Sequence, residues 1–197
     1  MDMPLIIKVA SIPKERMQVY FIDNDEYFKR KAIFSDEDDQ LFSDNDERAI
    51  FFAKGVVETV KKLNWAPDII HVHGWMASLL PLYIKEYYSD EPLFSESKIV
   101  TSVYDKDFEG SLNGGLAEKI KFDKISDDKI SILQEPNYTN IIKSAVSNSD
   151  AIVQGSSEIP EEIAEEIRNR EVPALSFQEE DSFESYLNFY KELISEE

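Results

Sequence analysis

The sequence predicts an α/β fold, a Rossmann-like, doubly wound sheet whose strands are mostly parallel. Strand-like and helix-like segments alternate along most of the 197 residues, and this alternation is typical of parallel sheets with helical crossovers. Short runs rich in Ile and Val at 69–72, 98–104 and 151–154 have the composition of buried parallel strands. The length fits one domain, so we expect a single domain over residues 1–197.

Two further strands are expected near the amino terminus, from Pro4 to Ile12 and from Met17 to Ile22. Only a few residues separate them, which favours a hairpin-like feature, and we expect both to belong to the same sheet. Because no βα unit precedes them, the doubly wound fold is expected to lack its first βα unit. The acidic run at 36–39 is interpreted as a solvated loop rather than a metal site.

The best helix prediction begins near Ser43 and ends near Leu63. Acidic residues at its start and Lys61 and Lys62 in its last turns suit the helix dipole. Ser43 is the expected N-cap. The apolar residues at helical spacing are Ala49, Ile50, Ala53, Val56, Val57, Val60 and Leu63.

A second helix is expected from Trp75 to Tyr88, in which Pro81 either kinks the helix or lies in its first turn. Other expected elements are short helices and loops over 112–130, helices at 137–147 and 160–167, a strand at 172–175 and an amphipathic helix at 182–194. Exposure of the apolar stripe of this last helix would indicate a partner contact, whereas packing on the sheet would remove that indication.

The composition excludes several classes of partner. Lys and Arg number 21 against 40 Asp and Glu, which gives a net charge of −19 and repels phosphate backbones and anionic lipids. We therefore expect no nucleic acid and no membrane as partner. The chain has no cysteine, no run long enough to span a membrane and no signal-peptide pattern, so a cytoplasmic protein is expected.

Both histidines of the chain lie in the segment His71-Val72-His73-Gly74-Trp75, at the carboxyl end of a predicted strand. Ligands of open α/β sheets bind at such strand ends. His71 is expected to be a hydrogen-bonded core residue, whereas for His73 a ligand-facing role and a structural role are both open. A turn at Gly74 could present backbone N–H groups to an anion. We expect no metal, because zinc needs a third protein ligand and none is suitably spaced.

Two other strand ends carry polar groups. Tyr104 and Asp105 end the next predicted strand and would lie beside His73 in a parallel sheet. The turn Gly155-Ser156-Ser157 could hold an anion, but capping of the following helix is the preferred interpretation. No glycine-rich nucleotide loop and no G-x-S-x-G motif occurs, so no cofactor is expected.

The order of these segments resembles the N-terminal, catalytic domain of bacterial glycogen synthases and plant starch synthases, over roughly residues 5 to 170. The segment from Trp65 to Trp75 is similar to the family's W-x-P-D-hydrophobic-hydrophobic-H-x-H-D-W motif. The other matching segments are Asp44 to Arg48 (D-N-x-x-R-F), Leu80 to Tyr83 (L-x-P-x-Y) and Ser149 to Ser156 (A-D-x-I-T-x-V-S).

This resemblance implies the GT-B fold of glycosyltransferase family five, whose members transfer glucose from ADP-glucose to an α-1,4-glucan. Three positions depart from the family pattern: Gly74 replaces its acid, Tyr104 its histidine and Asp105 its asparagine. The family's K-T-G-G-L loop and C-terminal domain are also absent from the chain. We therefore expect the isolated chain to be inactive, and no residue is assigned a catalytic role.

The resemblance makes His73, Trp75, Tyr104 and Asp105 the candidate substrate-binding residues, with α-glucan or ADP-glucose as the candidate ligands. The leading hypothesis is a glycogen-synthase-like domain that is inactive alone and binds glucan or a partner protein. One alternative is an active glucosyltransferase whose missing domain comes from a second chain. Another is a non-catalytic interaction module with the same fold.

Overall fold

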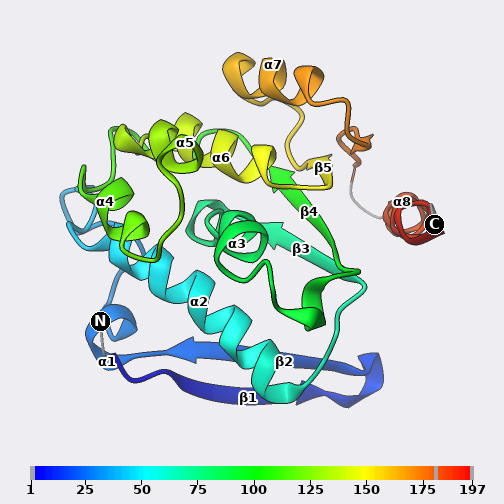
Figure 1. Cartoon of the computed structure of the whole chain (residues 1–197), viewed down its shortest axis with the longest axis horizontal. Helices are drawn as coiled ribbons and strands as arrows, with labels where there is room; N and C mark the ends of the chain where they lie inside the picture. Colours follow the sequence, from blue (N-terminus) through cyan, green and yellow to red (C-terminus); the bar gives the residue numbers. More distant parts are fainter. Residues whose placement is uncertain (1–2, 180–181, 196–197) are drawn as a thin grey trace.

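The structure, a computed structural model, describes residues 3–179 and 182–195. Its centre is a parallel sheet in the order β3-β4-β5-β6, so the predicted α/β fold is confirmed (Figure 1). The four strands are β3 (Ile69–His73), β4 (Lys98–Val103), β5 (Ala151–Gln154) and β6 (Ala174–Leu175). β3 pairs with β4 in a register that sets His73 opposite Ser102, so the carboxyl ends of these two strands lie next to each other.

The first two strands, β1 (Ile6–Ile12) and β2 (Met17–Asp23), form an antiparallel hairpin. The predicted hairpin is confirmed, but its expected place in the parallel sheet is wrong, because it forms a separate two-stranded sheet. The hairpin packs under the long helix α2 (Figure 1). A Cβ added at Gly55 of that helix would come within 3.0 Å of Leu5 and 3.2 Å of Ile22. The glycine thus permits the close approach that holds the hairpin on the helix rather than on the sheet edge.

Helix α2 (Asn45–Leu63) buries Ala49, Ala53 and Val57 in the core. The expected cap is wrong: Ser43 is exposed, Asp44 occupies the N-cap position, and no side chain caps the helix. The Asp44 carboxylate instead pairs with the guanidinium of Arg30. At the other end, Asn64 adopts the left-handed conformation, with φ of 50°, and its N–H bonds to the last turn.

The segment predicted as one helix over 75–88 is divided into three short pieces. They are a 3-10 turn at Trp75–Ala77, α3 (Leu80–Leu82) and a π-helical turn at Tyr83–Tyr87. Pro81 lies in the first turn of α3, one of the two predicted positions. Because proline has no N–H to donate, the chain cannot continue a regular helical ladder from the preceding turn.

The remaining described helices are α1 (Asp25–Phe28), α4 (Leu116–Lys121), α5 (Asp127–Ile130), α6 (Tyr138–Ser147), α7 (Glu161–Asn169) and α8 (Phe183–Ser195), with further 3-10 turns at Pro13–Glu15, Pro92–Phe94 and Ser131–Gln134. The larger apolar core includes buried residues of α2, α3 and α6. α8 packs by itself on another part of the sheet, through Phe189 and Leu193, and lies apart from the other helices in Figure 1. Of the predicted apolar stripe, Tyr186 and Tyr190 are partly buried against this cluster, whereas Phe183 and Leu187 are exposed, so the expected packing on the sheet holds for only half of the stripe.

None of the helices in the described part of the chain combines the length and the apolar composition that a membrane span requires.

Candidate functional site at the carboxyl ends of β3 and β4

The carboxyl ends of β3 and β4 bring together two of the predicted site residues. Nδ1 of His73 lies 2.6 Å from the hydroxyl of Tyr104, which immediately follows β4. The two side chains come from positions 31 residues apart and meet because the strands are adjacent and parallel. Burial lowers the pKa of His73, so its imidazole is neutral at pH 7 and can exchange a hydrogen bond with an uncharged hydroxyl.

The ring of Tyr104 lies directly over Gly155, at the end of β5. A Cβ at that glycine would be 2.5 Å from Cε1 of Tyr104, so a side chain there would displace the phenol ring. The hydroxyl of Tyr138 fixes the backbone on the other side, donating to the carbonyls of Tyr104 at 3.1 Å and Asp105 at 2.8 Å. Sequence reasoning missed Tyr138, because nothing in its own segment indicates a contact so far along the chain.

Asp105 is exposed beside this pair, and its backbone N–H donates to the hydroxyl of Ser156 at 3.2 Å. The expectation that the 155–157 turn caps the next helix is wrong. α7 starts only at Glu161, with Pro160 at its N-cap and no side-chain cap. Ser156 instead connects the loop after β5 to the loop after β4 through this hydrogen bond.

The loop after β4 is acidic. Asp105, Asp107 and Glu109 accompany a single cation, Lys106, whose ammonium lies 2.6 Å from the Glu109 carboxylate. Desolvation raises the pKa of Asp107 and the charge of Asp105 raises it further, although a backbone hydrogen bond from Trp75 opposes both. The backbone at Trp75, expected to attract an external anion, thus faces a carboxylate of the protein itself. The negative charge of this loop favours an uncharged polar ligand over a phosphate.

Trp75 is buried beneath the exposed residues His73 and Asp105 rather than lying beside them on the surface. Its side chain is 1% exposed and packs between Phe34 and Phe108, with ring centroids 4.8 and 5.1 Å away. A sugar stacks only on an open aromatic face, and this indole has none. The turn that directs Trp75 inward is made at Gly74, which has φ of 73°. Glycine suits this position because a residue with a side chain would be strained at that φ.

His71 is hydrogen-bonded, as expected, but it is half-buried on the edge strand β3 rather than in the core. Its Nε2 lies 2.8 Å from Oγ of Ser102, and its Nδ1 hydrogen-bonds with the hydroxyl of Tyr190. Burial, and then the neighbouring His73, lower the pKa of His71 to about 4. In the part of the chain that the structure describes, no group of three or more His, Asp or Glu side chains is arranged to hold a metal ion.

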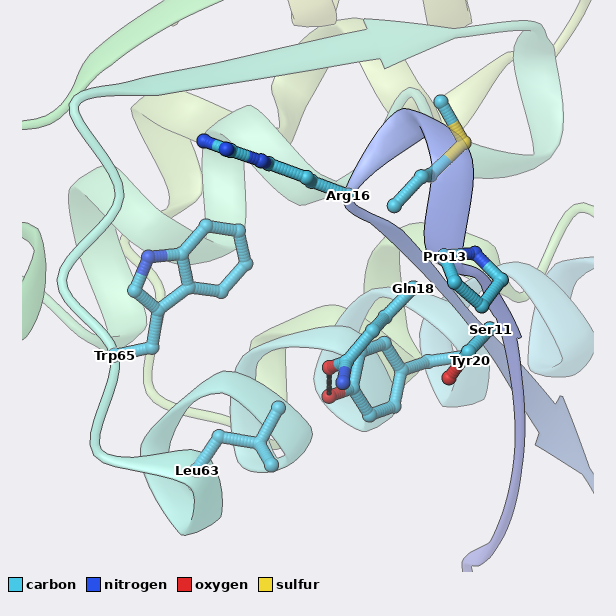
Figure 2. Close-up of a pocket in the computed structure, with 8 residues that line it drawn as sticks. Ser11, Pro13, Arg16, Gln18, Tyr20, Leu63 and Trp65 are labelled. Carbon is cyan, nitrogen blue, oxygen red and sulfur yellow. Dashed lines mark hydrogen bonds between the residues drawn. The ribbon is translucent and has the colours of Figure 1, made fainter.

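Two cavities lie away from these strand ends. One of about 590 Å³ separates the tip of the hairpin from the α2–β3 connection and is lined by Arg16, Leu63 and Trp65, among others (Figure 2). The other, of about 540 Å³, lies between the start of the hairpin, α2 and α4, with Phe122 at its edge. Neither cavity is lined by a predicted site residue. The candidate site is therefore defined by the hydrogen-bonded residues at the strand ends and not by a cavity.

Comparison with known families decides the ancestry of the chain. The family described as "Starch synthase catalytic domain" matches residues 1–175. The chain belongs to this family. It is 34% identical to the glycogen synthase of Chlorobium luteolum over 178 residues, which are 89% of this chain and 35% of that relative. It is 33% identical to the glycogen synthase of Chlorobium limicola over 160 residues, covering 81% of this chain and 32% of the relative.

A solved structure has the same fold. The catalytic domain of starch synthase IV from Arabidopsis thaliana, bound to ADP and acarbose, superposes with a TM-score of 0.59 at 18% identity, covering 94% of this chain and 35% of that one. The predicted resemblance to glycogen and starch synthases is thereby confirmed for family and fold. Since the chain spans about a third of these proteins (35% of the first relative), this starch synthase catalytic domain region need not carry their whole activity.

Proposed function

We propose that this starch-synthase-type region binds α-glucan at the surface formed by His73, Tyr104 and Asp105, and that alone it does not transfer glucose. The observation that carries the proposal is the hydrogen-bonded pair of His73 and Tyr104, with the Asp105 carboxylate exposed beside it. An imidazole, a phenol and a carboxylate supply both donors and acceptors for sugar hydroxyls. The phenol ring also provides apolar area for a pyranose face.

Charge favours the glucan over the nucleotide sugar. Three carboxylates and one lysine follow β4, and the lysine is already paired with Glu109. A nucleotide diphosphate would enter this field without a free cation to offset its charge. The starch synthase IV structure contains both ADP and acarbose, and we extend only glucan binding to this chain.

Absence of transfer by the chain alone follows from the same residues. Release of a sugar from a diphosphate needs positive groups that stabilise the leaving phosphate. At the positions where the resemblance implies an acid, a histidine and an asparagine, this chain has Gly74, Tyr104 and Asp105. Gly74 offers no side chain, and neither Tyr104 nor Asp105 carries a positive charge.

Isothermal titration with maltoheptaose tests the glucan proposal. We expect binding heat with the wild-type chain, its loss in Tyr104→Ala, and unchanged binding in Phe122→Ala. Phe122 is a suitable control because its side chain is 85% exposed and lies at the distant second cavity. A wild-type titration without heat above dilution, or equal binding by Tyr104→Ala, would overturn the proposal.

The alternative is an active glucosyltransferase completed by a second chain. The relatives are about three times as long as the matched region, which is 35% of the first relative, so another polypeptide could supply the rest. Incubation with ADP-glucose and glycogen tests transfer by the chain alone and in the presence of that second polypeptide. We expect no ADP release in either case. Release only with the second polypeptide that disappeared in both His73→Ala and Tyr104→Ala would establish the alternative, whereas release from the purified chain would overturn the proposal that the chain alone does not transfer glucose.

A further inference from the structure

The helix α8 contacts His71 of β3. The hydroxyl of Tyr190 hydrogen-bonds with Nδ1 of His71, and the phenol ring packs edge-on against the imidazole with centroids 5.7 Å apart. The other imidazole nitrogen lies 2.8 Å from Oγ of Ser102 on β4. His71 thus connects the sheet to α8, and both of its ring nitrogens are engaged by hydroxyl groups.

α8 is held by few buried side chains. Among its described residues, only Phe189 and Leu193 are buried, and they pack on small apolar side chains of β4 and β5. Phe183 and Leu187, on the same helix, are 79% and 51% exposed. An element that buries so little apolar area opens locally at a low cost in free energy, so a change at one polar contact can decide whether it stays docked.

We propose that α8 is a pH-sensitive latch, docked on the sheet while His71 is neutral and released when His71 is protonated. A neutral imidazole donates from one nitrogen and accepts at the other, which suits two hydroxyl partners. A protonated imidazole would place a charge under the helix, with the His73 ring tilted against it at a centroid distance of 4.0 Å. The inference concerns the helix alone and does not depend on glucan binding.

The surroundings of His71 offer hydroxyl groups but no counter-charge to a proton. The groups that contact the two imidazoles are Ser102 of β4, Tyr104 just after it and Tyr190 of α8, with the ring of Tyr186 beside that of Tyr190 at a centroid distance of 6.4 Å. No carboxylate forms a hydrogen bond with either imidazole within the ranges 3–179 and 182–195, and the Asp107 carboxylate acts on Tyr104 rather than on His71. A buried charge without a counter-charge is unfavourable.

The direction of the effect follows from linkage. Burial and His73 lower the pKa of docked His71 to about 4, whereas the ordinary value is 6.5. The docked form therefore binds fewer protons, so docking is fully favourable above pH 6.5 and weakens as the pH falls towards 4. With the ordinary value restored in the released form, the docking equilibrium constant falls about tenfold between about pH 7.5 and about pH 5.5.

Hydrogen–deuterium exchange of the full chain tests the latch. At each pH, the protection of amides in α8 is normalised to the intrinsic rates of an unfolded peptide. We expect protection of α8 to fall about tenfold between the two pH values, while the amides of β5 stay protected. Equal protection of α8 at both, or parallel loss of protection in β5, would overturn the proposal.

Two variants connect the change to His71. His71→Gln keeps a donor and an acceptor but cannot be charged, so its α8 protection should not depend on pH. Leu187→Ala, which alters an exposed residue of the same helix, should keep the wild-type dependence. If His71→Gln does not fold, NMR titration of the wild-type histidines replaces it. A His71 pKa near 6.5 in the wild type would then overturn the latch. A His71 pKa well below 6.5 in the wild type, together with a higher His71 pKa in Leu193→Asp, would support the latch.

Discussion

Substitution of Gly155 by alanine should destabilise the protein through one identifiable contact. The new Cβ would lie 2.5 Å from Cε1 of Tyr104, and 2.8 and 2.9 Å from two further ring atoms. Contacts this short force the ring to move, and overpacking of this kind costs about 1–3 kcal/mol. For a chain of this size, each kcal/mol corresponds to a fall in Tm of about 2–4 °C. Displacement of the ring would also break the hydrogen bond between Tyr104 and His73.

A double-mutant cycle measured by urea unfolding isolates that contact. In a Tyr104→Ala background the ring is gone, so Gly155→Ala should cost close to nothing, and the coupling free energy should equal about 1–3 kcal/mol. Gly114→Ala is the matched control, because no atom lies within 4 Å of its added Cβ. An equal cost of Gly155→Ala in both backgrounds would refute the contact between the glycine and the ring.

Three further predictions concern stability and can be measured by urea unfolding. Trp75→Ala should cost about 3–5 kcal/mol, because it empties a buried site between two aromatic rings; a cost below 1 kcal/mol would contradict that burial. Lys119→Met should be destabilising at pH 7, since the ammonium lies 2.6 Å from buried Asp46 and 2.8 Å from Glu47. The hydrogen bond from Lys119 lowers the pKa of Glu47, so the stabilisation by this ion pair is present above the ordinary pKa of 4.5 and is lost as the pH falls below it. The difference in unfolding free energy between wild type and Lys119→Met should therefore shrink on acidification. A difference that does not change with pH would argue against the ion pair. Asn64→Val should cost about 1–2 kcal/mol, because Asn64 has φ of 50°, whereas Asn64→Gly should cost nothing; equal effects would refute a conformational origin.

The parallel strands could be predicted from the sequence because each is a short apolar run between recognisable helices. β5 has the predicted bounds, and β3 differs by one residue. The sheet to which the hairpin belongs could not be predicted. The hydrophobic pattern of a segment shows that it forms a strand but does not show which strand it pairs with. Its separation depends on the contact of Gly55 with Leu5 and Ile22, which no local pattern indicates.

The candidate site was predictable to a similar degree. The meeting of His73 and Tyr104 follows from two adjacent parallel strand ends. The burial of Trp75 does not, because it depends on Phe34 and Phe108, which lie in loops of irregular structure. The contact between His71 and Tyr190 joins residues 119 positions apart, beyond the reach of any reasoning from spacing.

Glucan binding at the ends of β3 and β4 is tested most directly by NMR of the two histidines. Because the chain contains only His71 and His73, their imidazole resonances can be assigned with one substitution. We predict that maltoheptaose shifts the His73 resonance in a saturable manner, that ADP-glucose at the same concentration leaves it unchanged, and that the maltoheptaose effect is absent in Tyr104→Ala. A His73 resonance that does not respond to maltoheptaose, or that responds to ADP-glucose instead, would contradict the proposed function.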